Sequence, residues 1–157
     1  MEKQFTTLLL AIKDGKIMLA EKKRGFGVGK INGVGGKVEP NETVEEAMLR
    51  ETKEEAGIIP IDHEKVAVIM FDEFVNGVRK MIIMNVFLCS EFEGTPRETE
   101  EMKPCWFSLD KIPYYRMFPD DKLWLPEVLA GKKIEGCFWF DENFNMIDYK
   151  IKEVIEF

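Results

Sequence analysis

Apolar residues along this chain gather in short runs separated by turn residues, a pattern that is typical of β-strands. Asp14-Gly15 and Asn76-Gly77 each stand between two such runs, and both dipeptides favour tight hairpin turns. A further turn is expected over 141–145. The predicted strands are Phe5–Ile12, Ile17–Glu21, Lys30–Val34, Val66–Val75, Val78–Cys89, Pro104–Ser108, Gly136–Phe140 and Met146–Val154.

Two helices are predicted among these strands. Thr43, followed three residues later by Glu46, forms a capping box, and Gly57 suits the position just after a helix C-terminus. A second, shorter helix is expected over Pro119–Ala130. Many strands with two helices, not in strict βαβ alternation, predict an α/β protein whose mixed sheet is covered on both faces.

The first predicted helix carries acids where a core-facing stripe should be apolar. The stripe that begins at Val44 and includes Met48 continues at Glu51 and Glu55, with Glu54 beside them. The helix macrodipole disfavours three acids in the last two turns, and the acids also repel one another. A hard divalent cation held by oxygen ligands would compensate. The alternative is a solvated acidic face, which fits the first-turn acids but not those that interrupt the stripe.

Size and charge restrict the class of protein. With 157 residues, 45% of them apolar and 32% charged, the chain is expected to form one globular domain over residues 1–157. A net charge of −7 argues against a nucleic acid polymer as the main partner. It leaves room for a single nucleotide, whose phosphates can be bound through metal ions.

Cysteine use and hydropathy indicate the compartment. Cys89, Cys105 and Cys137 form no CxxC pair, and no secretory signal precedes them, so they are expected to be reduced, buried structural thiols. No stretch approaches the length of a transmembrane helix. The expected location is therefore cytoplasmic, with no membrane partner, and the expected assembly is a monomer.

Several reaction classes lack the residues they need. His63 is the only histidine and lies in a polar, exposed loop, while Ser90 and Ser108 lack the GxSxG elbow of a serine hydrolase. The glycine-rich run GFGVGK is not a Walker A loop, because Ile31 follows Lys30 where Ser or Thr is required. Metal-assisted hydrolysis of a phosphoanhydride remains.

The segment Gly36–Ile58, GKVEPNETVEEAMLRETKEEAGI, resembles the signature of the Nudix hydrolases. Thr52 departs from that pattern, since the family usually has a bulky aliphatic residue there. The resemblance implies the αβα sandwich of the Nudix fold, with a mixed sheet and two helices, and Mg²⁺ as cofactor with Mn²⁺ as a substitute. The matching positions are Gly36, Glu42, Arg50, Glu51, Glu54, Glu55, Gly57 and Ile58.

Glu51, Glu54 and Glu55 are the expected metal ligands, and one of them could also polarise the attacking water. The resemblance implies two additions to this metal site, the backbone carbonyl of Gly35 and the carboxylate of Glu101. From sequence alone, a solvated loop acid is the alternative for Glu101.

Charged residues near the acids have more than one candidate role. Arg50 could orient a glutamate, touch a phosphate or form a helix ion pair. Lys37 follows Gly35-Gly36, whose lack of side chains allows close approach of the backbone, and is a phosphate candidate. Gly36 and Lys37 are therefore expected at the phosphate end of a substrate site.

Three further segments resemble the oxidized purine nucleoside triphosphate hydrolases within the Nudix family: KKRGFGVGKINGVGGKV, GTPRETEEMKPCWF and MFPDD. Ile31 and Phe118 stand where vertebrate members usually carry Trp. The resemblance implies hydrolysis of 8-oxo-dGTP, 2-hydroxy-dATP and 8-oxo-dATP to the monophosphate and pyrophosphate, which sanitises the nucleotide pool.

The candidate base site rests on Asn32 and the adjacent Asp120 and Asp121. Mutual repulsion and burial would raise the pKa of one aspartate, so that the two together offer a donor and an acceptor to a purine edge. Either aspartate could instead cap the second helix. Other candidates for the substrate pocket are the aromatic residues Phe26, Phe71 and Phe118, for which simple core packing is the alternative, and Thr7 and Lys22, which match family positions.

Two other functions remain open. The chain could hydrolyse another nucleoside diphosphate derivative, such as a dinucleotide polyphosphate, although Asn32 with Asp120 and Asp121 favours oxidized purines. It could also be a catalytically silent nucleotide-binding module, but such a module should have lost some of the three helix glutamates. In each case the expected partner is a small-molecule nucleotide.

Overall fold

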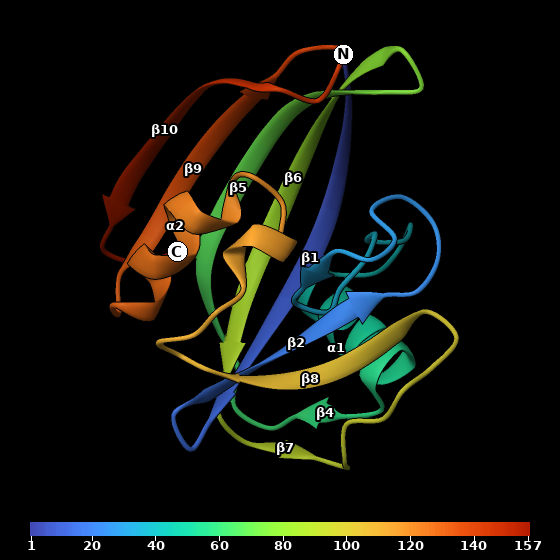
Figure 1. Ribbon diagram of the computed structural model, residues 1–157, viewed down its shortest axis with the longest axis vertical. Helices are drawn as coiled ribbons and strands as arrows, with labels where there is room; N and C mark the ends of the chain where they lie inside the picture. The colour runs from blue at the N-terminus through green and yellow to red at the C-terminus, as the bar shows by residue number, and fades with distance from the viewer.

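The protein, described over residues 1–157 by a computed structural model, has ten strands, two α-helices and one short 3₁₀ turn (Figure 1). The strands are β1 (Glu2–Lys13), β2 (Lys16–Lys22), β3 (Ile31–Asn32), β4 (Ile59–Pro60), β5 (Glu64–Val75), β6 (Val78–Cys89), β7 (Phe92–Glu93), β8 (Met102–Ser108), β9 (Lys133–Phe140) and β10 (Met146–Val154). The helical segments are α1 (Val44–Ala56), η1 (Tyr114–Arg116) and α2 (Asp121–Leu129).

Eight strands form one mixed sheet in the order β10-β9-β5-β6-β1-β2-β3, with β8 pairing to β2. β1 runs parallel to β6, and β5 runs parallel to β9, whereas the other neighbours are antiparallel. β4 and β7 form a separate two-stranded sheet. The mixed sheet expected from the sequence is therefore confirmed.

Both predicted Gly-containing hairpin turns are present. Asp14 and Gly15 have φ values of 53° and 73°, and Asn76 and Gly77 have values of 52° and 77°. Positive φ at both central residues is the geometry that matches the twist of two antiparallel strands. These turns join β1 to β2 and β5 to β6.

The two helices cover opposite faces of the sheet: in Figure 1, α2 lies in front of β5 and β9, and α1 lies behind β1 and β2. Successive residues of β1 point to opposite faces. Leu8 and Leu10 enter the apolar cluster that contains Trp124 of α2, while Leu9 and Ala11 enter the cluster beneath α1. This arrangement confirms the expected αβα sandwich, and it gives each helix its own apolar core.

Some details differ from the sequence predictions. The short elements η1, β4 and β7 carry no periodic signal and were not predicted, and α2 begins at Asp121 rather than at Pro119. All three cysteines are free, but only Cys89 is buried, so the expectation of buried thiols is wrong for Cys105 and Cys137. Both of these lie in strands whose surroundings leave the side chain partly open.

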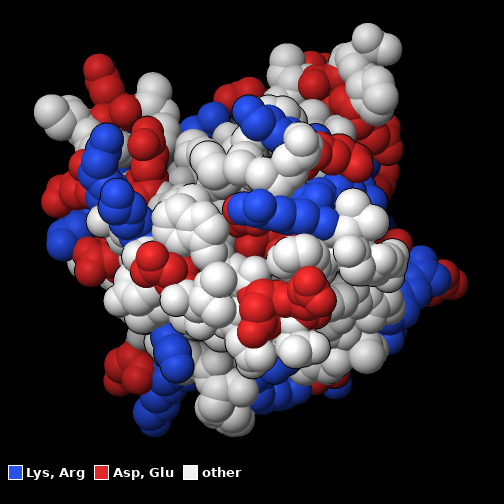
Figure 2. Space-filling model, turned by 90° about the horizontal axis from the view of Figure 1, so that it is seen from above, with Lys and Arg blue, Asp and Glu red and all other residues white.

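Two properties of the surface complete the description. Neither helix has the length and apolar character that crossing a lipid bilayer requires. Figure 2 shows the molecule from the end at which the β5–β6 and β9–β10 turns lie in Figure 1. On this face basic and acidic side chains are interspersed, so the net charge of −7 is not collected into one patch there.

Candidate active site

The helix α1 begins and ends as its sequence predicts. The Thr43 side chain accepts a hydrogen bond from the Glu46 amide, and the Glu46 side chain accepts one from the Thr43 amide. Gly57 closes the helix with φ of 75°. Because both ends are fixed locally, the angular positions of the side chains between them are fixed as well. Met48 and Ala56 pack in the core beneath the helix.

The acids that interrupt the apolar stripe of α1 (Glu51, Glu54 and Glu55, called the acidic seam below) differ in exposure. Glu55 is only 7% exposed, Glu51 is half-buried and Glu54 is exposed. The Gly35 amide donates a hydrogen bond to Glu55 Oε1 over 2.8 Å. Burial, opposed by that hydrogen bond and assisted by the charge of Glu51, raises the Glu55 pKa to about 7. The seam thus places a carboxyl group inside the protein where a purely structural helix would place an apolar one.

The backbone at Gly36 touches the acidic seam. A Cβ at this position would lie 2.5 Å from the carboxyl carbon of Glu51, so no larger residue fits without a shift. Burial also raises the Glu51 pKa, and the charges of Glu54 and Glu101 act in the same direction. The segment before α1 and the seam are therefore packed against each other, with backbone polar groups next to carboxylates.

Arg50 binds the acids around it. Its Nε and Nη2 donate to the two carboxylate oxygens of Glu42 over 2.9 and 2.6 Å, and its Nη1 donates to Glu51 Oε1 over 2.9 Å. The hydrogen bond from Arg50 is the main cause that lowers the Glu42 pKa to about 2. Nη2 also donates to the carbonyl oxygen of Lys37, whose side chain is exposed. Of the roles predicted for Arg50, the structure shows both orientation of a glutamate, Glu51, and a helix ion pair, since Nη1 lies 3.4 Å from Glu54 Oε2 one turn along α1.

The donor set of this region suits a hard divalent cation, although no three acidic, cysteine or histidine side chains form a closed set of ligands. Glu51, Glu55 and Glu101 are near enough for each of the first two to have its pKa raised by the charge of Glu101. Glu101 lies on the exposed loop before β8, where its Oε1 accepts a hydrogen bond from Arg24 over 3.0 Å. Crowded carboxylates beside a backbone segment are the oxygen ligands that Mg²⁺ and Mn²⁺ take.

A cavity of about 160 Å³ lies next to the acidic seam. The hydroxyl of Thr7 is buried and has no hydrogen-bond partner, which leaves a polar group available to a ligand. The Asn32 Oδ1 accepts the Gly33 amide over 2.8 Å, so its amide nitrogen stays available too. Six residues predicted for the site share this cavity: Thr7, Lys22, Asn32, Gly35, Gly36 and Phe118.

Other predicted pocket residues do not line this cavity. Phe71 packs on Phe138, with ring centroids 5.8 Å apart, and belongs to the core beneath α2. Its interpretation as a wall of the pocket is thus not supported, and the core alternative holds. Phe26 is 69% exposed and stacks on Phe118, with centroids 5.9 Å apart and planes at 12°. Phe26 therefore contacts Phe118, which lines the cavity, but does not line the cavity itself.

Asp120 and Asp121, called the aspartate pair below, are 4% and 2% exposed. Asp120 Oδ2 accepts a hydrogen bond from Trp124 Nε1 over 2.9 Å, and Asp121 Oδ2 accepts one from the Phe118 amide over 3.0 Å. Asp120 occupies the N-cap position of α2, as the alternative predicted, but its side chain makes no capping hydrogen bond. Burial raises the Asp120 pKa to about 6 and raises the Asp121 pKa well above its usual range, with repulsion from Asp120 as the second cause for Asp121.

Glu73 is a further acid near the aspartate pair that the sequence predictions missed. It is half-buried on β5, opposite Lys80 of β6. Burial raises its pKa, and the charge of Asp120 raises it further. The signal was present in the strand alternation, which puts residue 73 on the same face as Phe71.

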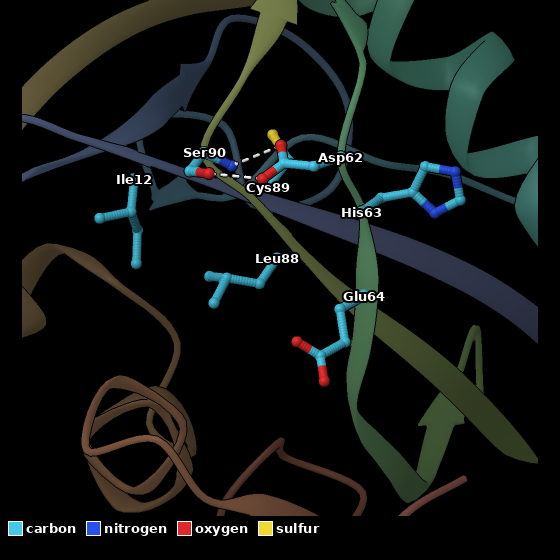
Figure 3. A pocket seen from close by; sticks show the side chains of 7 residues that line it. All are labelled: Ile12, Asp62, His63, Glu64, Leu88, Cys89 and Ser90. Carbon is cyan, nitrogen blue, oxygen red and sulfur yellow. Dashed lines mark hydrogen bonds between the residues drawn. The ribbon is translucent and has the colours of Figure 1, made fainter.

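A second cavity, of about 370 Å³, lies at the far end of β5 and β6 (Figure 3). Its one well-placed acid, Asp62, already accepts hydrogen bonds from the amide and hydroxyl of Ser90 and from the amide of Glu91. Burial raises the Cys89 pKa to about 12, so this thiol is not a nucleophile at neutral pH. The ring of His63 extends away from the Asp62–Ser90 contact, as Figure 3 shows. We therefore assign no catalytic role to this cavity.

Comparisons with known proteins agree with this site. Residues 3–128 match the NUDIX domain family. The chain is 42% identical over 148 residues to the oxidized purine nucleoside triphosphate hydrolase of Danio rerio, covering 94% of each chain. It is also 42% identical over 151 residues to the protein of the same name from Mus musculus, covering 96% of each. A MutT protein from Bacillus halodurans has the same fold, with a TM-score of 0.84 and 25% identity over 95% of this chain and 97% of that one. The chain therefore belongs to the Nudix hydrolase family.

Proposed function

We propose that this protein hydrolyses oxidized purine nucleoside triphosphates to the monophosphate and pyrophosphate and so sanitises the nucleotide pool. The proposed substrates are 8-oxo-dGTP, 2-hydroxy-dATP and 8-oxo-dATP. The observation that carries the proposal is the cavity that joins Gly35 and Gly36, beside the acidic seam, to Phe118, beside the aspartate pair. A purine triphosphate needs a site for its phosphates and a site for its base, and the two ends of this cavity are the candidates. The names of the relatives from Danio rerio and Mus musculus support this substrate class.

The acidic seam, the Gly35 carbonyl and Glu101 are the proposed ligands of Mg²⁺, with Mn²⁺ as a substitute. When bound, the cation would neutralise phosphate charge and supply an activated water. Support comes from the pKa values of Glu51 and Glu55, which burial raises and the charges of neighbouring acids raise further, although Arg50 hydrogen-bonds Glu51. One glutamate of the seam could also polarise the attacking water and take its proton.

Residues between the two ends have separate proposed tasks. Arg50 holds Glu51 by a direct hydrogen bond and thereby fixes one carboxylate of the seam. Lys22 lines the cavity, and the exposed Lys37 follows Gly36, so both can offer positive charge to the phosphates. The unpartnered hydroxyl of Thr7 is available to a polar group of the substrate. None of these tasks requires a covalent intermediate.

The aspartate pair is the proposed reader of the purine edge, together with Asn32. Two buried carboxyls with raised pKa values retain a proton to higher pH than exposed aspartates do. A protonated carboxyl donates a hydrogen bond and an ionised one accepts, so the pair can match either oxidized guanine or oxidized adenine. Phe118, whose amide donates to Asp121, stacks on Phe26, and this aromatic stack offers an apolar surface to the base.

We extend the proposal to the whole chain. Residues 1–157 would act as one hydrolase domain, because β9, which lies beyond the family match, pairs with β5 inside the main sheet. The three free cysteines support a reducing, cytoplasmic location. The proposed partner is a small nucleotide, without a nucleic acid polymer or a membrane, and the proposed assembly is a monomer. Sedimentation at micromolar concentration tests the last point.

A substrate panel tests the function directly. Purified protein with Mg²⁺ is given oxidized and unmodified purine triphosphates and a dinucleotide polyphosphate, and released pyrophosphate and orthophosphate are measured. We expect pyrophosphate, with the highest kcat/KM for the oxidized purines. In ¹⁸O-labelled water the label should enter pyrophosphate, as attack at the β-phosphorus requires. Orthophosphate release, or preference for the dinucleotide polyphosphate, would assign another Nudix reaction. Nucleotide binding without any hydrolysis would identify a silent module.

A further inference from the structure

The turn between β9 and β10 holds Phe144 in an unfavourable backbone conformation. Its φ is 59°, in the left-handed region that a bulky aromatic residue rarely adopts. Asp141 fixes the turn: its Oδ1 accepts hydrogen bonds from the amides of Asn143 and Asn145, each over 2.9 Å. Its Oδ2 accepts a third from the Asn145 side chain over 3.1 Å. Strain of this kind persists only where the surroundings over-determine it, and it gathers at functional positions.

The ring of Phe144 connects this turn to the aromatic residues of the candidate base site. It stacks on Phe140, with centroids 4.6 Å apart and planes at 5°. Its edge meets Phe26 at 5.8 Å and 84° and Phe118 at 6.1 Å and 80°. Phe26, Phe118 and Phe144 come from three segments that are far apart in the sequence, and Phe118 alone of them lines the cavity.

We propose that Phe144 is a positioning residue for purine binding, an inference that rests on the proposed function. One ring meets both members of the Phe26–Phe118 stack nearly at right angles, an arrangement that aromatic pairs favour. It thereby holds the face of Phe118 towards the cavity and keeps the exposed loop residue Phe26 in place. The rigid turn at Asp141 gives this contact its fixed geometry.

The location of Phe144 predicts which kinetic constant it controls. The phosphate end of the cavity, at Gly35 and Gly36, is lined by other segments of the chain. Loss of the Phe144 ring should therefore weaken binding of the base, and so raise KM, without changing the arrangement of the acidic seam that governs kcat. If Phe144 only filled space in the turn, its loss would lower stability and leave KM unchanged.

Two substitutions separate these roles. Phe144→Asn removes the ring and introduces a residue that tolerates positive φ, so the turn should stay folded. Relief of strain offsets part of the packing lost against Phe140 and the core, so the melting temperature should change little. Phe144→Tyr keeps the ring and should behave as wild type. Tyr115→Asn is the matched control, because Tyr115 is 86% exposed and has no aromatic partner. The same Phe144→Asn change is made in a Phe118→Ala background to ask whether it acts through Phe118.

The measurements are KM and kcat for 8-oxo-dGTP, the melting temperature, and the calorimetric Kd of 8-oxo-dGMP, which requires no hydrolysis. Phe144→Asn should raise KM and Kd about 3–10-fold, the size expected for lost aromatic contacts. It should change kcat less than about twofold, and its effect on Kd should largely vanish in the Phe118→Ala background. The Tyr115→Asn control should leave all four quantities as in wild type.

The outcomes are separable. Unchanged Kd in Phe144→Asn, or an equal effect with and without Phe118, would overturn the inference while leaving the proposed function intact. A lower melting temperature with a parallel loss of kcat would also overturn it, since that is the signature of a structural residue. Suppose that Phe144→Asn weakens binding of 8-oxo-dGMP but that the wild-type protein hydrolyses no triphosphate. That result would support the positioning role of Phe144 and reject the proposed function.

Discussion

The acidic seam and the aspartate pair both put carboxyl groups inside the protein, but they differ in what surrounds the charge. The seam has the guanidinium of Arg50 against Glu51, crowded acids, and a backbone segment packed beside it. The aspartate pair has only neutral donors, the Trp124 indole and the Phe118 amide. Burial without a positive partner favours the protonated acid, whereas crowded acids open to a cation favour metal binding. One chain thus uses two solutions for buried acids, and each suits one end of a nucleotide.

The largest expected effect comes from neutralising the seam. Glu55→Gln should lower kcat about 10²–10³-fold, because an amide is a poor ligand for a hard cation and a few kcal/mol of transition-state stabilisation are lost. Glu54→Gln should act in the same direction. The fold should persist, and relief of repulsion in the last turns of α1 should hold or raise the melting temperature. Glu45→Gln, an exposed first-turn acid of the same helix, is the control. Retained Mg²⁺-dependent turnover in both seam variants would remove these residues from the metal site.

The next effect concerns the protonation of the aspartate pair. Asp120→Asn and Asp121→Asn keep a donor and an acceptor but cannot exchange them by titration. Each should therefore change the ratio of kcat/KM for oxidized guanine to that for oxidized adenine, by roughly 1–3 kcal/mol for each buried group left unpaired. The measurement is kcat/KM for both substrates in both variants. Equal proportional losses would leave the pair as a scaffold and move base reading elsewhere.

A smaller, less selective effect is expected at Phe118. Stacking does not read base edges, so Phe118→Ala should lower kcat/KM for all oxidized purines by a similar factor, about 2–12-fold for a lost aromatic contact. The comparison with the aspartate variants uses the same two substrates. A strong change in the guanine-to-adenine ratio here would show that Phe118 contributes more than a stacking surface.

The smallest effect concerns the stability of the fold, whose dependence on pH should have opposite signs for Asp120 and Glu42. Asp120 has a pKa raised to about 6 from 3.8, so the native protein binds more protons than the unfolded chain, and stability falls as pH rises through that window. Glu42 has a pKa lowered to about 2 from 4.5, so its contribution is present above pH 4.5 and is lost as pH falls towards 2. Asp120→Asn should flatten the decline above pH 4, and Glu42→Gln should flatten the loss below it. Denaturant unfolding across pH, with metal chelated, checks both slopes, and the same slope change in both variants would refute the distinction.

Features fixed by neighbouring residues could be predicted from the sequence. The Thr43–Glu46 capping box, the Gly57 stop and the two hairpin turns depend on local backbone conformations, and all are present. The acids of the seam were identifiable because they break a helical period, which is again a local property. Local sequence patterns were therefore sufficient to predict the helix that carries these acids and the turns of the neighbouring sheet.

Features that depend on distant packing could not be predicted. Whether Phe71 faces the cavity or the core is decided by Phe138 on another strand. Asp120 is the N-cap residue of α2, but its side chain bonds the Trp124 indole, and Asp121 bonds the Phe118 amide, so neither carboxylate caps the helix. The strained aromatic Phe144 gives no sequence signal, since its turn suits many residues and its contacts come from other segments. Tertiary contacts, not propensity, settle such positions.

The most direct test of the contrast between the two regions is the affinity of the nucleotide-free protein for Mn²⁺. The concentration of free Mn²⁺ is measured by electron paramagnetic resonance. Wild type, Glu55→Gln and Asp120→Asn are titrated under identical conditions at pH 7.5. Metal binding should weaken about 10-fold or more in Glu55→Gln, because a ligand is lost, and should stay within about twofold of wild type in Asp120→Asn. Equal affinities in all three proteins, or a larger loss in Asp120→Asn, would contradict the assignment of the seam to the metal and of the aspartate pair to the base.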